Sequence, residues 1–333
     1  MPYASLPVTY DPRARHVTFF SPALGISRSF FIYIPPDVDE CHPAPAIYLL
    51  RGHEREWMIR YRLISPITCS INPFEDRSRD GRNVIDVYED LRTAGRVGPL
   101  ALVFPGTSSD DNRIPGMLVN MRAPHLANGA TGIGSGRFAD FFFHDLIPYV
   151  DRHFPVIPEG RARGIVGFSL GGAMALSVAA RRPDLFACAG AYDGTFLYAC
   201  DRGRRVRRRD RVIANPMFDA AYGVPRDLTF IAQHNAANLI LRGDAAALAR
   251  VVWVVAYGPE SQEPWQSNYY RGEHLLACLH ARGLANALED PVILDGDHTW
   301  RTADRFIALT LPLYNRALRH ESSKAPDRVE RPR

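Results

Sequence analysis

The chain has 333 residues, 46% of them hydrophobic, which is enough to bury a sizeable core. A formal net charge of +4 is too small to indicate a nucleic-acid-binding protein. Five scattered cysteines without CxxC spacing favour neither a disulfide framework nor a zinc site, so we expect no metal and no cofactor.

The N-terminal segment lacks the basic region and the long apolar run of a signal peptide. No uncharged apolar stretch approaches the roughly 20 residues that a membrane-spanning helix needs. We therefore expect a cytoplasmic protein without a membrane partner.

Short hydrophobic runs alternate with amphipathic segments along the chain. Strands are expected at 19–35 (two strands), 46–50, 100–104, 162–168, 186–192, 250–257 and 291–294. Helices are expected at 84–94, 138–154, 171–181, 269–282 and 302–318. This alternation predicts an α/β fold with a mostly parallel sheet covered on both faces.

The domain organisation follows from where this alternation breaks. Residues 1–318 are expected to form a single domain, and the segment at about 196–244 reads as an insertion because it interrupts the strand–helix order. Residues 319–333 are polar and charged, which is typical of a flexible tail.

The strongest chemical motif is Gly167-Phe168-Ser169-Leu170-Gly171, a Gly-x-Ser-x-Gly pattern between an expected strand and an expected helix. A sharp turn there lifts the serine hydroxyl above the sheet, and the two flanking glycines leave room for that turn. The pattern predicts that Ser169 is the nucleophile of a serine hydrolase.

A serine nucleophile needs a histidine base and a carboxylate that orients the histidine. His298 is the best candidate because it lies in a loop directly after the last expected strand. For the acid we favour Glu260, which follows the strand at 250–257, with Glu263 and Asp193 as alternatives.

The oxyanion hole requires two main-chain N–H donors. One is expected from Leu170, which follows the nucleophile, and the other from His53, in the loop after the strand at 46–50. Gly52 allows the chain to turn in that loop.

The order of these motifs resembles the esterase D-like branch of the α/β-hydrolases, which includes S-formylglutathione hydrolases, feruloyl and siderophore esterases and mycolyltransferases. The matching segments are 48–52, 99–105, 142–154, 167–172, 182–186 and 296–300. The resemblance implies the α/β-hydrolase fold and ester chemistry at Ser169. Two positions depart from the family: Arg51 stands where His or Asp is usual, and Ser261 stands where the acid is often Asp.

Aromatic and basic residues suggest where a substrate could bind. Trp57, Trp265 and Trp300 lie in or beside the loops expected around the site. They are candidates for a substrate pocket, and the alternative is that they pack these loops onto the sheet. The arginine-rich segment 202–211 is expected to be a solvated loop, as charge runs usually are, with contact to an acidic substrate or partner as the alternative. No aromatic residues are interleaved with its arginines, which argues against nucleic-acid binding.

The sequence therefore predicts a serine carboxylesterase with a Ser169–Glu260–His298 triad, acting on a small-molecule ester or thioester. Two alternatives stay open: an acyltransferase that uses the same site, and a protein that keeps the fold for binding without catalysis.

Overall fold

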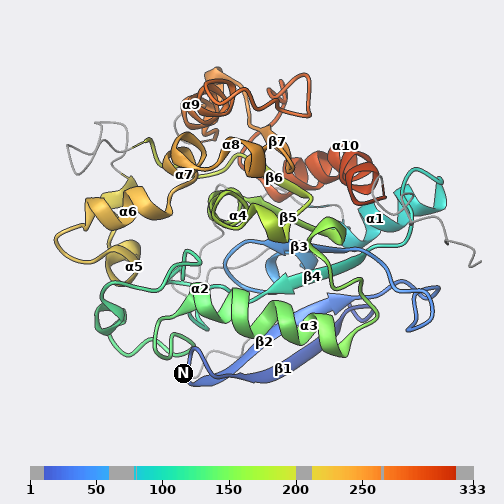
Figure 1. The fold of residues 1–333 in the computed structure, drawn as a ribbon, viewed down its shortest axis with the longest axis horizontal. Coiled ribbons are helices and arrows are strands. Elements are labelled where there is room, and N and C mark those ends of the chain that lie inside the picture. Colours follow the sequence, from blue (N-terminus) through green and yellow to red (C-terminus); the bar gives the residue numbers. More distant parts are fainter. Residues whose placement is uncertain (1–10, 60–78, 80, 200–211, 264–265, 320–333) are drawn as a thin grey trace, which may run out of the picture.

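A computed structural model describes residues 11–59, 79, 81–199, 212–263 and 266–319 of the protein. Its centre is a seven-stranded sheet in the order β1-β2-β4-β3-β5-β6-β7 (Figure 1). The strands are β1 (Arg15–Ser21), β2 (Ile26–Tyr33), β3 (Ala46–Leu50), β4 (Ala101–Pro105), β5 (Arg163–Phe168), β6 (Cys188–Tyr192) and β7 (Val252–Ala256). The pairs β1–β2 and β2–β4 are antiparallel and the other four are parallel. The predicted α/β-hydrolase architecture is confirmed.

Helices cover both faces of this sheet. The α-helices are α1 (Val84–Thr93), α2 (Phe138–Asp140), α3 (Ile147–His153), α4 (Leu170–Arg181), α5 (Asp219–Tyr222), α6 (Leu228–His234), α7 (Ala236–Arg242), α8 (Ala245–Leu248), α9 (Tyr269–His280) and α10 (Trp300–Arg319). A π-helical segment, η3 (Phe141–Leu146), joins α2 to α3. Short 3₁₀ turns are η1 (Glu56–Met58), η2 (Pro124–Ala127), η4 (Gly160–Ala162), η5 (Pro183–Leu185), η7 (Pro216–Phe218) and η8 (Glu260–Gln262).

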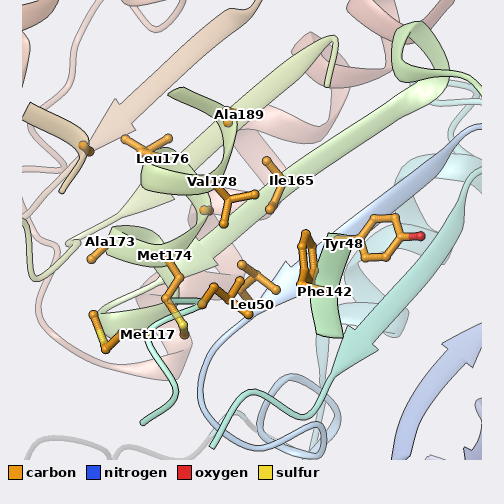
Figure 2. Packing of buried hydrophobic residues seen from close by; sticks show 14 of the residues in the cluster. Tyr48, Leu50, Met117, Phe142, Ile165, Ala173, Met174, Leu176, Val178 and Ala189 are labelled. Carbon is orange, nitrogen blue, oxygen red and sulfur yellow. The ribbon is translucent and has the colours of Figure 1, made fainter. Parts of the chain in front are cut away.

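The hydrophobic core has two layers because neighbouring strand residues point to opposite faces. In β3, Tyr48 and Leu50 belong to the layer under α4, whereas Ile47 and Leu49 belong to the layer under α1 and α10. Figure 2 shows the first layer, in which small and aliphatic side chains of α4 pack beside Ile165 of β5. The small residues of α4 allow this helix, which begins directly after Ser169, to lie close to the sheet.

One expectation about the later part of the chain is changed. Residues 291–294 do not form a strand and meet the sheet only through an isolated bridge between Tyr257 and Val292. The segment at about 196–244 lies between β6 and β7, and its described part carries α5, α6 and α7. The arginine-rich segment 202–211 and the tail from 320 onward lie outside the described residues.

Within the described residues, none of the helices combines the length and the apolar character needed to cross a lipid bilayer.

Arg79 ties the loop after β3 to helix α10. Its guanidinium donates two hydrogen bonds to the Asp304 carboxylate, at 2.7 and 2.6 Å, and both residues are buried. The same guanidinium donates to the main-chain oxygens of Glu56, Trp57 and Ile59. This pair therefore holds the turn η1 against α10.

Replacing Asp304 with asparagine is expected to lower the free energy of unfolding by about 3–5 kcal/mol, because it leaves the Arg79 charge buried without its counter-ion. Urea denaturation monitored by fluorescence measures this change. Asp295→Asn is the control: it removes the exposed partner of Arg305 on the same helix and should change stability little. Equal effects from the two variants would contradict the prediction.

Candidate active site

The ends of three parallel strands meet at one edge of the sheet. Leu50, the last residue of β3, pairs with Gly167 of β5, and Phe168 of β5 pairs with Tyr192 of β6. The next residues in the chain, Ser169 and Asp193, therefore emerge side by side. A main-chain hydrogen bond of 3.1 Å from Ser169 N–H to the Tyr192 oxygen fixes the two loops together.

Ser169 occupies a strained turn between β5 and α4. Its backbone has φ 57° and ψ −121°, in the positive-φ region that L-residues rarely adopt. Both flanking glycines are sterically required. A Cβ on Gly167 would lie 2.1 Å from main-chain atoms of Gly171, and a Cβ on Gly171 would lie 1.9 Å from the Leu50 oxygen. The turn is thus possible only with glycine at both positions.

His298 bridges Ser169 and a buried carboxylate. Its Nε2 lies 2.9 Å from the Ser169 Oγ, and its Nδ1 is hydrogen-bonded to Oδ2 of Asp193. The side chain of Asp193 is fully buried, and that of His298 is 17% exposed. The serine, the imidazole and the carboxylate form a continuous hydrogen-bonded chain.

The acid predicted from the sequence was therefore wrong. Glu260 is exposed and accepts a hydrogen bond from the Tyr270 hydroxyl. Glu263, the first alternative, does not contact His298 either; burial raises the pKa of its carboxyl, and main-chain N–H groups of Tyr270 and Tyr269 oppose that shift. Asp193, the second alternative, occupies the position because it follows β6, the strand directly beside β5.

The loop that carries His298 is anchored from two sides. The Tyr192 hydroxyl donates to the main-chain oxygen of Asp297 at 2.7 Å, and burial raises the pKa of this tyrosine, which keeps it a donor. The Asp297 carboxylate accepts from the hydroxyls of Thr299 and Thr302 at 2.6 and 2.9 Å. The ring of Phe168 packs against His298 with centroids 4.7 Å apart. The imidazole is thus held over the end of β6.

The two expected oxyanion donors differ in what their N–H groups contact. Leu170 is the first residue of α4, so its N–H has no acceptor within the helix. His53, in contrast, donates its N–H to Oε2 of Glu56 at 2.6 Å, and Gly52 donates to the same oxygen at 2.9 Å. The Glu56 carboxylate is buried. In this structure the His53 donor is therefore engaged by an internal anion.

Two of the three tryptophans expected in a substrate pocket are buried and pack against other side chains instead. Trp57 is 1% exposed, and its indole N–H donates to the Leu50 oxygen. Trp300 is 3% exposed and packs edge-to-face on Trp57 and on Phe168, with centroids 5.1 Å apart in each case. Both fix loops to the sheet, which contradicts the pocket prediction; Trp265 lies outside the described residues.

Arg51, the residue that departs from the family pattern, lies within this aromatic cluster. Its guanidinium carbon is 5.3 Å from the centre of the Phe168 ring and 6.0 Å from that of Trp300, and its Nε is 3.8 Å from Oε1 of Glu56. Cation–π contacts of this kind favour a charge over an aromatic face. Arg51 thus adds a cation behind the Ser169–His298 pair.

The arrangement suits nucleophilic acyl chemistry. A histidine that contacts the hydroxyl through one nitrogen and a carboxylate through the other can accept the serine proton. The described residues contain no group of three or more His, Cys, Asp or Glu side chains that could hold a metal ion.

Asp193 carried one usable sequence signal. Like Ser169, it is a polar residue immediately after a buried strand, and a glycine follows it in Tyr192-Asp193-Gly194. The same signal could have raised Asp193 above Glu260, which lies four residues beyond the end of β7.

Sequence comparison finds one family over most of the chain. The family model described as "Putative esterase" matches residues 21–273. S-formylglutathione hydrolase from Arabidopsis thaliana is 25% identical over 196 residues, which is 55% of this chain and 56% of that protein. The chain thus matches little more than half the length of this relative.

Solved structures with the same fold cover nearly the whole chain. A ferulic acid esterase is 19% identical, with a TM-score of 0.63 over 91% of this chain and 98% of its own. S-formylglutathione hydrolase from Agrobacterium tumefaciens is 18% identical, with a TM-score of 0.60 over 93% and 99%. MPT51 from Mycobacterium tuberculosis is 16% identical, with a TM-score of 0.55 over 93% and 100%. At these sequence identities, the structural similarity shows that the fold is shared.

Proposed function

Because the chain belongs to this esterase family, we propose that it is a serine carboxylesterase with a Ser169–His298–Asp193 triad. The observation that carries the proposal is the chain of contacts from the Ser169 Oγ through His298 to Asp193. Its substrate is a small carboxylic ester or thioester, and no cofactor takes part.

The proposed reaction has two halves. His298 Nε2 removes the proton of Ser169 as the Oγ attacks the acyl carbonyl carbon, and Asp193 holds the Nδ1 proton of the resulting imidazolium. The tetrahedral intermediate collapses to an acyl-enzyme, and the leaving alcohol or thiol takes the proton from His298. Water then repeats the sequence, releasing the acid and regenerating Ser169.

The proposed oxyanion hole uses the N–H of Leu170 and that of His53. The first lies at the N-terminus of α4, where the helix dipole also favours negative charge. The second is engaged by Glu56, so the substrate oxyanion must compete with a carboxylate for this donor.

Replacing Glu56 with glutamine is expected to raise kcat/KM for a p-nitrophenyl ester by roughly tenfold, because it removes a negative charge beside the developing oxyanion. The amide oxygen can still accept from the Gly52 and His53 N–H groups. The loop backbone stays anchored by Thr107, whose N–H donates to the Gly52 oxygen at 2.8 Å.

Glu54→Gln is the matched control for this variant. Glu54 is a similarly buried carboxylate two residues away. It accepts from the Ser29 hydroxyl and lies 3.0 Å from Nδ1 of the His53 ring, whereas the main-chain N–H groups of Gly52 and His53 donate to Glu56. Its rate should stay near that of the wild type. A fall in kcat/KM for Glu56→Gln would show that the carboxylate supports the loop instead of competing for its donor.

A fluorophosphonate probe tests the proposed function directly. The wild-type protein should form a covalent adduct that peptide mass spectrometry locates on Ser169, and it should hydrolyse short-chain p-nitrophenyl esters. A protein that neither reacts at Ser169 nor turns over any ester of a chain-length series is not a serine esterase.

A further inference from the structure

Asn268 makes three hydrogen bonds to Asp193. Its main-chain N–H donates to Oδ1 of Asp193 at 2.7 Å. Its side-chain Nδ2 donates to the Asp193 main-chain oxygen at 2.9 Å and to Oδ2 at 3.3 Å. Oδ2 is the same oxygen that meets Nδ1 of His298. One residue from the segment after β7 thus binds both oxygens of the buried carboxylate and the backbone behind it.

The side chain of Asn268 binds Asp193 and does not cap α9, the helix that Asn268 precedes. Asn268 is the N-cap residue of α9, a position at which asparagine commonly binds the free N–H groups of the first turn. Here its side chain makes no capping hydrogen bond. The N–H groups of Tyr269 and Tyr270 interact with the carboxyl of Glu263. The Asn268 amide is thus directed at Asp193 and not at the first turn of α9.

Asp193 needs support from outside its own strand. Its backbone has φ 46°, a left-handed conformation that costs about 1–2 kcal/mol for a residue with a Cβ. The N–H of Asp193 donates to the Ala256 oxygen at 2.7 Å, which holds the backbone on the β7 side only. The Asn268 amide binds the carbonyl at the other end of the residue and so fixes the direction of the side chain.

We propose that Asn268 is a positioning residue that orients the Asp193 carboxylate toward His298. The expected effect on catalysis rests on the proposed function, in which Asp193 orients His298. The sequence predicted that the segment after β7 supplies the acid. In the structure this segment instead supplies Asn268, which binds an acid that directly follows β6. Without the side-chain amide, Asn268 holds the carboxylate only through its main-chain N–H at Oδ1, and Oδ2 and the Asp193 carbonyl lose their donor. The carboxylate can then turn away from Nδ1, and the imidazole loses the partner that sets its tautomer.

The test compares Asn268→Ala with Asn286→Ala. Asn286 is a matched control because its side chain, like that of Asn268, holds a neighbouring segment by hydrogen bonds. It binds the N–H and oxygen of Val255 and the Leu288 oxygen, but it does not touch Asp193. The first readout is the low-field proton NMR resonance of His298 Nδ1–H, assigned by its loss in His298→Ala. The second is the steady-state rate of ester hydrolysis.

Asn268→Ala is expected to weaken or abolish the low-field resonance and to lower kcat by about tenfold to a hundredfold, with KM changed less than about twofold. Asn286→Ala should keep both the resonance and kcat. The proposal is overturned if Asn268→Ala retains the resonance and kcat of the wild type, or if Asn286→Ala lowers both equally. Because the resonance does not depend on turnover, it tests the role of Asn268 even in a protein without esterase activity, and Ser169 labelling tests the proposed function separately.

Discussion

Replacing Ser169 with alanine is expected to lower kcat for ester hydrolysis by about 10⁶-fold, because no other group in the proposed mechanism forms the acyl-enzyme. The fold should be unaffected, since the side chain donates only to the imidazole and the turn depends on the neighbouring glycines. The residual rate, measured with a p-nitrophenyl ester at high enzyme concentration, reports what the remaining groups contribute. The fluorophosphonate adduct should disappear in the same variant.

Ser177→Ala is the control for this substitution. Ser177 is a buried serine further along the same helix, α4, and has no place in the proposed mechanism. Its hydrolysis rate and probe labelling should match those of the wild type. If Ser169→Ala retained the wild-type rate, the assignment of the nucleophile would be wrong.

Replacing Asp193 with asparagine is expected to lower kcat by about 10⁴-fold. The amide has nearly the same shape as the carboxylate, so packing is preserved. Its NH₂ group can face Nδ1 of His298 and donate to it, which leaves the imidazole proton on Nε2. That tautomer cannot accept the proton of Ser169. The effect therefore isolates the role of the charge and the acceptor from that of the side-chain volume.

The paired variant Glu260→Gln distinguishes the two candidate acids. Glu260 is exposed and hydrogen-bonded to Tyr270, so its neutralisation should leave kcat within about twofold of the wild type. The opposite pattern, with a large loss for Glu260→Gln and none for Asp193→Asn, would restore the acid expected from the sequence. Both variants should retain wild-type KM if substrate binding does not involve either carboxylate.

The sheet explains how an acid on β6 can serve a histidine that follows β7. The Tyr192 hydroxyl, from the last residue of β6, binds the main-chain oxygen of Asp297 and so draws the histidine loop over this strand. Asp193 is the next residue after Tyr192, and its Oδ2 therefore faces the imidazole. The last residue of β6 thus binds the histidine loop, and the next residue in the chain supplies the carboxylate.

The buried Glu56 carboxylate is expected to slow the proposed reaction. One donor of the proposed oxyanion hole is bound to a buried carboxylate, whereas the other lies at the start of α4. A single main-chain donor is worth about 3 kcal/mol of barrier in this kind of site. Slow wild-type hydrolysis together with a faster Glu56→Gln variant is therefore the pattern that this geometry predicts.

The sequence by itself determined the features that depend on neighbouring residues. The alternation of apolar runs and amphipathic segments predicted the mostly parallel sheet, which the structure confirms. The Gly-x-Ser-x-Gly pattern predicted the strained turn at Ser169, because only glycine at Gly167 and Gly171 leaves room for the chain there. The loop position of His298 predicted its meeting with Ser169, and the two side chains lie 2.9 Å apart.

Only the tertiary structure decided which carboxylate meets His298, whether the N–H of His53 is available, and whether Trp57 and Trp300 face a substrate. Carboxylates are common after strands, so their sequence positions do not reveal which one is aimed at the imidazole. That choice depends on strand order, on the φ of Asp193 and on a hydrogen bond from Tyr192 to a loop more than 100 residues away. The burial of the tryptophans likewise depends on how α10 packs against β5. These are contacts between distant segments, and local sequence carries little information about them.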